Sequence, residues 1–119
     1  MLDFRNIDIW KRNHQLTLDI YKATQQFPKE EIFGLTSQIR RAVSSIPTNI
    51  AEGCGRRTNA ELANFLNFAS GSASEVEYEL LLAKDLGYVT AEQCDAWTQE
   101  ISEIRSMLAA YMKRLRSEH

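Results

Sequence analysis

The sequence predicts an all-α protein, an antiparallel up-down four-helix bundle whose second helix is kinked by a proline. Three observations support this fold class. Apolar residues in four long segments recur at alternating steps of three and four, short connections separate these segments, and no segment shows the alternation of a strand. At 119 residues the chain is long enough for one hydrophobic core but not for two, so a single domain over residues 1–119 is expected.

The first helix is expected from about Asp8 to Phe27. Leu16, Ile20 and Phe27 lie on one apolar face of such a helix. Pro28 ends it, because the residue before a proline is pushed out of the helical region.

The second helix is expected over residues 34–53. A stripe of apolar residues and a neighbouring stripe of polar residues run along it. Pro47 lies inside the pattern and has no N–H to donate, which predicts a kink. The polar stripe is expected to seal the rim of the core or to meet another helix or subunit. The apolar stripe consists of Leu35, Ile39, Ala42, Ile46 and Ile50, and the polar stripe of Gln38, Arg41, Ser45, Asn49 and Glu52.

The third helix is expected over residues 59–86, where Thr58 and Glu61 form a capping box at its start. Its middle, residues 69–74, contains only small side chains. Gly71 within it lowers helix stability by about 1 kcal/mol relative to alanine. We therefore expect a neighbouring helix backbone to approach closely at this segment.

The fourth helix is expected to begin after Thr90, which forms a second capping box with Gln93. Gly87 ends the helix before it. Basic residues near the end of the fourth helix complement the helix dipole.

The composition is that of a soluble globular protein, with 44% hydrophobic and 25% charged residues. A net charge of −2 argues against a protein that coats nucleic acid by bulk electrostatics. The N-terminus does not resemble a signal peptide, and no apolar run reaches the length of a membrane span. A cytoplasmic protein without a membrane partner is expected, with Cys54 and Cys94 reduced.

Residues that could carry catalysis or bind a metal are few. His14 and His119 are the only histidines, and neither has a metal-ligand spacing to Cys54 or Cys94. The Gly-Cys-Gly sequence at residues 53–55 is interpreted as a helix end, because no strand precedes it and no Lys-Ser/Thr follows. We expect no metal, no cofactor and no enzymatic activity.

Three carboxylates, Glu75, Glu77 and Glu79, are closely spaced on the third helix. No nucleophile accompanies them, so structural ion pairs are favoured over acid–base catalysis. Glu77 is expected to face water, whereas Glu75 and Glu79 are expected at the core rim, paired with Arg40 or Arg41 as structural or interface residues.

Paired arginines are the candidates for a binding site. Arginine makes planar, bidentate contacts with phosphate as readily as with carboxylate. Arg40, Arg56 and Arg57 are the candidate nucleic-acid contacts, chiefly Arg56 and Arg57 in the exposed turn. Arg40 and Arg41 lie on opposite flanks of the apolar stripe, which predicts different roles. Salt bridges to the third helix or to a neighbouring subunit are the favoured alternative.

Two motifs, SQIRRA at residues 37–42 and NIAEG at residues 49–53, continue into a matching pattern at residues 65–79. Together they resemble a family of small bacterial four-helix bundles. That family includes proteins encoded by intervening sequences within 23S rRNA genes and accessory proteins of diversity-generating retroelements. The resemblance implies a ring-shaped homopentamer and no enzyme, and its retroelement members bind nucleic acid and a reverse transcriptase.

Two functions remain open on these grounds. The leading hypothesis is a non-enzymatic oligomeric scaffold that binds RNA or a ribonucleoprotein. The alternative is a protein–protein interaction module whose arginines serve only subunit contacts.

Overall fold

The computed structural model describes residues 2–117, and within them the chain forms four long helices and two single-turn 3₁₀ helices. The predicted all-α four-helix fold is thereby confirmed. The elements are η1 (Phe4–Asn6), α1 (Asp8–Thr24), η2 (Lys29–Glu31), α2 (Leu35–Cys54), α3 (Asn59–Asp85) and α4 (Ala91–Ser117).

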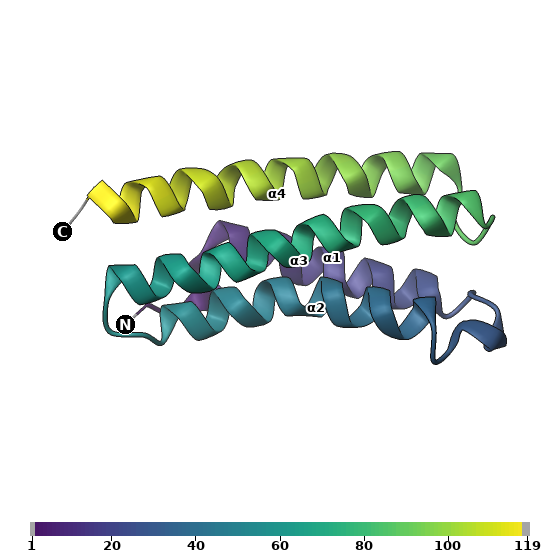
Figure 1. Ribbon diagram of the computed structural model, residues 1–119, viewed down its shortest axis with the longest axis horizontal. Helices are drawn as coiled ribbons and strands as arrows, with labels where there is room; N and C mark the ends of the chain where they lie inside the picture. Colours follow the sequence, from purple (N-terminus) through teal and green to yellow (C-terminus); the bar gives the residue numbers. More distant parts are fainter. Residues whose placement is uncertain (1, 118–119) are drawn as a thin grey trace.

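The helices lie side by side in an elongated molecule of 48 × 22 × 20 Å (Figure 1). In Figure 1 the colour sequence runs in opposite directions along successive helices. The α2–α3 turn and the C-terminal end of α4 therefore lie at the same end of the molecule. Helix α2 packs most extensively against α3, and of the neighbouring pairs of long helices α1 and α4 make the fewest contacts.

The apolar stripe predicted for the second helix is buried along its whole length, and no member is more than 5% exposed. These side chains join one hydrophobic cluster that receives residues from all four helices. Pro47 is buried inside α2, which continues from Leu35 to Cys54. A kink of the helix axis at Pro47 stays a prediction.

The helix ends follow the capping signals with one exception. Thr58 Oγ1 accepts a hydrogen bond from the Glu61 N–H, and Thr90 and Gln93 bond each other's backbone N–H reciprocally. Helix α1, however, ends at Thr24, three residues before the predicted end. The N–H groups of residues 25–27 bond to carbonyls three residues back, because the chain tightens into turns ahead of the proline.

The small-residue segment of α3 contacts its neighbours differently from the prediction. Ala69 and Ala73 are fully buried, but Gly71 is exposed, and a Cβ atom there would meet nothing within 4 Å. The glycine that a close approach requires is Gly53, where an added Cβ would lie 2.8 Å from Leu62 Cδ1 and 3.0 Å from Phe65 Cβ. The predicted close approach of a neighbouring helix backbone at Gly71 is therefore wrong, because no other part of the described chain lies against this residue.

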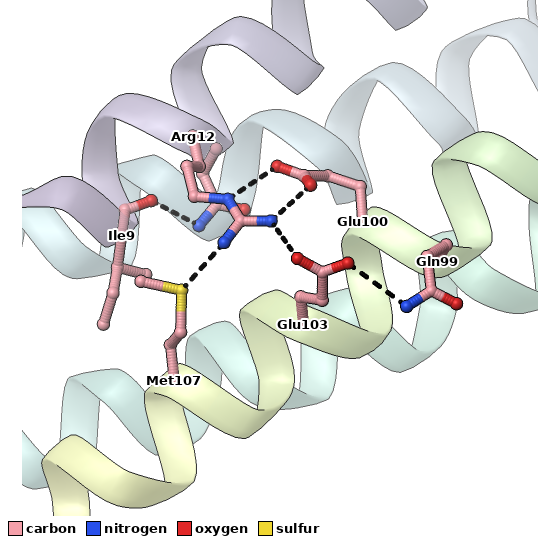
Figure 2. A network of polar contacts seen from close by, with 7 residues as sticks. Ile9, Arg12, Gln99, Glu100, Glu103 and Met107 are labelled. Carbon is pink, nitrogen blue, oxygen red and sulfur yellow. Dashed lines mark hydrogen bonds and ion pairs between the residues drawn. The ribbon is translucent and has the colours of Figure 1, made fainter.

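A charged cluster holds α1 to α4 (Figure 2). Arg12 donates from Nε to Glu100 at 2.9 Å and from a terminal nitrogen to Glu103 at 2.7 Å. A further N–H of Arg12 points at the sulfur of Met107. The two carboxylates raise the pKa of Arg12 above its usual value, and the Arg12 hydrogen bond lowers that of Glu103.

The two glycines permit a matched test by differential scanning calorimetry. Gly53→Ala is expected to lower the free energy of unfolding by about 1–3 kcal/mol, because its Cβ would overlap Leu62 and Phe65. Gly71→Ala should raise that free energy by up to about 1 kcal/mol through helix propensity. A loss of stability in Gly71→Ala would instead indicate that another molecule packs against this position.

Candidate functional site

A polar groove of about 290 Å³ lies between α2 and α3. Three residues of the polar stripe predicted for the second helix, Gln38, Arg41 and Ser45, line one wall together with Ala42, and residues from successive turns of α3 form the other. The polar stripe was expected to seal the rim of the core, but a groove remains between α2 and α3 along this part of the rim. The lining residues are Gln38, Arg41, Ala42, Ser45, Ser72, Glu75 and Glu79.

Hydroxyl groups join the two walls of this α2–α3 groove. Ser72 Oγ donates to Ser45 Oγ at 3.0 Å. Asn49 Nδ2 donates to the same Ser45 oxygen at 3.0 Å and to the Ser45 carbonyl at 2.9 Å. The polar stripe therefore does meet another helix through a hydrogen bond, as the sequence predicted.

Glu79 is the most unusual group in the groove. Glu79 is only 8% exposed. Its Oε1 atom is buried and has no hydrogen-bond partner among the described residues. Burial raises the pKa of Glu79 to about 7, and the negative charge of Glu75 on the preceding turn contributes to this shift. Glu79 therefore releases its proton at a much higher pH than an ordinary carboxyl group does.

Arg40 and Arg41 lie on opposite flanks of α2 and have different surroundings, as predicted. Arg40 Nε donates to Thr24 Oγ1 at 2.7 Å, and its guanidinium lies over the Tyr21 ring, so it ties α2 to α1. Arg41 is exposed at the groove, and its guanidinium group forms no hydrogen bond or ion pair with the part of the chain that the structure describes. Phosphate contact by Arg40 stays a prediction.

The ion pairs predicted for the third helix are wrong within the described residues, and a different carboxylate forms one. Glu77, expected to face water, accepts a hydrogen bond from Arg105 of α4 at 2.8 Å. Glu75 and Glu79, expected to pair with Arg40 or Arg41, form no ion pair within residues 2–117. Sequence spacing could place these carboxylates on faces of a helix but not select their partners.

A second candidate site is the end of the bundle at the α2–α3 turn. A cavity of about 340 Å³ there is lined by Arg56, Arg57 and Arg114, among others. Arg56 pairs with Glu52 at 3.7 Å, and its guanidinium lies over the Phe65 ring. Arg57 is exposed and makes no hydrogen bond or ion pair with the described residues. This basic end therefore offers a cationic side chain without a partner in the described chain.

The remaining candidate residues show no reactive arrangement. His14 is exposed and stacks on Trp10, and His119 lies outside the described residues. Cys54 and Cys94 are free and buried, and burial raises the pKa of the Cys54 thiol. Among the described residues no three His, Cys, Asp or Glu side chains come together as a metal site. Nor does any described helix have the length and apolar character to span a bilayer.

Two residues of these sites were missed as candidates. Ser72 lies seven residues before Glu79 on the same stripe of α3, so helical spacing could have assigned it to the groove. Arg114 is one of the basic residues near the end of α4 that are expected to complement the helix dipole. Its place beside Arg57 depends on how α4 packs, which no local pattern reveals.

Comparisons with known proteins agree with this fold. The model of a family described as 23S rRNA-intervening sequence protein matches residues 5–110. A crystal structure of a protein with unknown function from the S23 ribosomal protein family of Bacteroides thetaiotaomicron VPI-5482 is similar, with a TM-score of 0.79 and 29% sequence identity. That similarity covers 88% of this chain and 98% of the other. No curated protein matches the chain.

The raised pKa of Glu79 predicts how stability depends on pH. Between pH 4.5 and about 7 the folded chain keeps a proton that the unfolded chain has released, so this group makes the free energy of unfolding fall as the pH rises. Glu79→Gln should remove this pH dependence of the free energy of unfolding. The difference between the melting temperature of the variant and that of the wild type should therefore become more positive from pH 5 to pH 8. Glu75→Gln should reduce the slope in part. Parallel melting curves for Glu79→Gln and wild type would contradict the assignment.

Proposed function

Since the chain belongs to the 23S rRNA-intervening sequence protein family, we propose that it is a non-enzymatic, cytoplasmic scaffold that assembles with copies of itself and contacts RNA. The observation that carries the RNA contact is the basic end, where Arg57 lies exposed beside Arg56 and Arg114 around one cavity.

Charge at this end supports phosphate binding despite the net charge of −2. Lys113 and Arg116 are exposed near the end of α4, close to Arg114. Guanidinium groups present several N–H donors in one plane, which suits phosphate oxygens. Several cations at one end of an elongated molecule attract a polyanion even when the whole chain is slightly acidic.

Exposed apolar side chains on α3 support self-association. Phe68, Tyr78 and Leu86 are each about half exposed or more, and Leu82 between them is half-buried. On a helix these positions share one outward face. The polar groove residues Ser72, Glu75 and Glu79 lie on this same face, between Phe68 and Leu82. Exposed apolar side chains at both ends of the face suit burial against another copy. The resemblance to pentameric relatives makes a homopentamer the expected stoichiometry.

The polar groups of the groove support a non-enzymatic role. Ser45 and Ser72 bond each other, and neither hydroxyl is hydrogen-bonded to a histidine, cysteine or carboxylate among the described residues that could act as its base. Binding, and not bond-breaking chemistry, is the use to which this arrangement is suited.

A specific observation favours the alternative, a protein–protein module without RNA binding. Arg56 is already paired with Glu52 and packed on Phe65, and Arg40 is bonded to α1. If Arg57 also serves a subunit contact, none of the three arginines predicted from the sequence to contact nucleic acid remains free for phosphate.

RNA binding can be measured by fluorescence anisotropy with a labelled single-stranded RNA over a range of salt concentrations. The double variant Arg56→Ala/Arg57→Ala should keep its fold but bind more weakly, and the log–log salt slope should fall by roughly one to two units. The control Lys22→Ala/Lys29→Ala removes two exposed cations from the opposite end and should bind normally. Equal affinity of both double variants would favour the alternative.

Assembly can be measured by light scattering after size exclusion at micromolar concentration. The wild type should exceed the 13.6 kDa of one chain several-fold. Phe68→Glu should reduce the mass, because it places a charge on the outward face of α3. Leu18→Glu alters an equally exposed apolar residue on α1 and should leave the mass unchanged. A stable wild-type monomer would refute assembly, whereas a dimer or tetramer would refute only the number five.

A further inference from the structure

The charged residues that line the α2–α3 groove do not balance one another. Glu75 and Glu79 lie one turn apart on α3, and Arg41 lines the facing helix without pairing with either. When both carboxylates are ionised, the groove has a net charge of −1. Because a buried carboxylate without a partner is unfavourable, the groove must take up a proton or another cation.

The position of Glu79 shows where such a cation is needed. The residue is more than nine-tenths buried, it lines the groove, and its Oε1 atom has no hydrogen-bond donor in the described chain. Ser72 Oγ lies on the same wall and can still accept a hydrogen bond. The interior of the groove thus offers acceptors, and the missing component is a charged donor.

We propose that the α2–α3 groove binds a guanidinium or alkylammonium group, which donates hydrogen bonds to Glu79 and is attracted by Glu75. The volume of about 290 Å³ admits such a head group together with the alkyl chain that carries it. At the rim, the exposed side chains of Arg41 and Gln38 can contact an acceptor elsewhere on the same ligand.

A metal ion suits this groove less well. Magnesium and calcium prefer six or more oxygen ligands, whereas the groove supplies two carboxylates, and no described group of three ligating side chains includes them. An organic cation needs only one or two carboxylates and binds through directed N–H donors. The inference concerns α2 and α3 alone and does not depend on RNA binding at the basic end.

The cation can come from two sources. One is a free small molecule with a guanidinium or amine, and the other is an arginine or lysine side chain of a second copy of this chain. Both supply the same chemistry to Glu79, and experiments on the full chain can separate them.

The first experiment is isothermal titration calorimetry with methylguanidinium at pH 8. Tetramethylammonium, a cation without N–H donors, is the ligand control. The wild type should bind methylguanidinium but not tetramethylammonium. Glu79→Gln should weaken methylguanidinium binding about tenfold or more. Arg41→Gln should tighten it, because a like charge is removed from the groove wall.

The pH dependence gives an independent readout. Glu79 must be ionised to bind a cation, and Glu75 and Arg41 are the other charged groups that line the groove. With the pKa of Glu79 at about 7, affinity at pH 8 should exceed that at pH 6 by about tenfold. This dependence should be absent in Glu79→Gln.

The second experiment identifies a cation supplied by a second copy. In that case free methylguanidinium does not bind the wild type, but Glu79→Gln should dissociate into smaller species at protein concentrations where the wild type remains assembled. Circular dichroism melting verifies that each variant is folded. The proposal is overturned if methylguanidinium fails to bind and Glu79→Gln leaves the assembly unchanged, or if tetramethylammonium binds equally well.

Discussion

The close packing of α2 against α3 is the constraint on which the rest of the structure depends. Gly53 has no room for a Cβ atom beside Leu62 and Phe65, and α2 packs against α3 more extensively than any other two helices pack. Small residues let two helix backbones approach closely. Because α2 also packs on α1, and α3 on α4, this pair sets the position of both outer helices.

The same packing explains why a polar groove forms beside a dry core. The apolar stripe of α2 faces inward, and the polar stripe, about one-third of a turn away, lies at the edge of the α2–α3 contact. Ser45 and Ser72 close part of that edge with one hydrogen bond. The longer side chains of Arg41 and Glu75 stay at the surface, so the space between them remains open above Glu79.

Helix α1 is held to α4 by a different kind of interaction. Arg12 bonds to Glu100 and Glu103 across a contact that is smaller than the others (Figure 2). Isolated ion pairs at a protein surface often contribute under about 1 kcal/mol each, but Arg12 donates to Glu100 from two nitrogens and also bonds Glu103, a geometry that is stronger than a single surface pair. The apolar face of α1 adds to this cluster, and Leu16 and Ile20 on it are almost completely buried.

Sequence reasoning succeeded where the determining interactions are local. Helical periodicity and capping boxes depend on residues within one or two turns, so four helices and most of their ends could be predicted. It failed where two helices must be placed relative to each other. The contacts of Arg12 with Glu100 and of Glu77 with Arg105 join residues 88 and 28 positions apart. Whether Gly53 or Gly71 meets a neighbour likewise depends on where helices touch.

The two candidate sites are opposite in charge, and the net charge of −2 conceals both. The groove is lined by the buried Glu79, the exposed Glu75 and the exposed Arg41, whereas the end of the bundle gathers arginines from the α2–α3 turn and from α4. A charged group can bind a ligand where its own chain supplies no partner of opposite charge. The net charge of the whole chain does not reveal such a place. Arg57 and Glu79 each meet that condition with opposite sign, so one molecule can bind an anion at its end and a cation along its side.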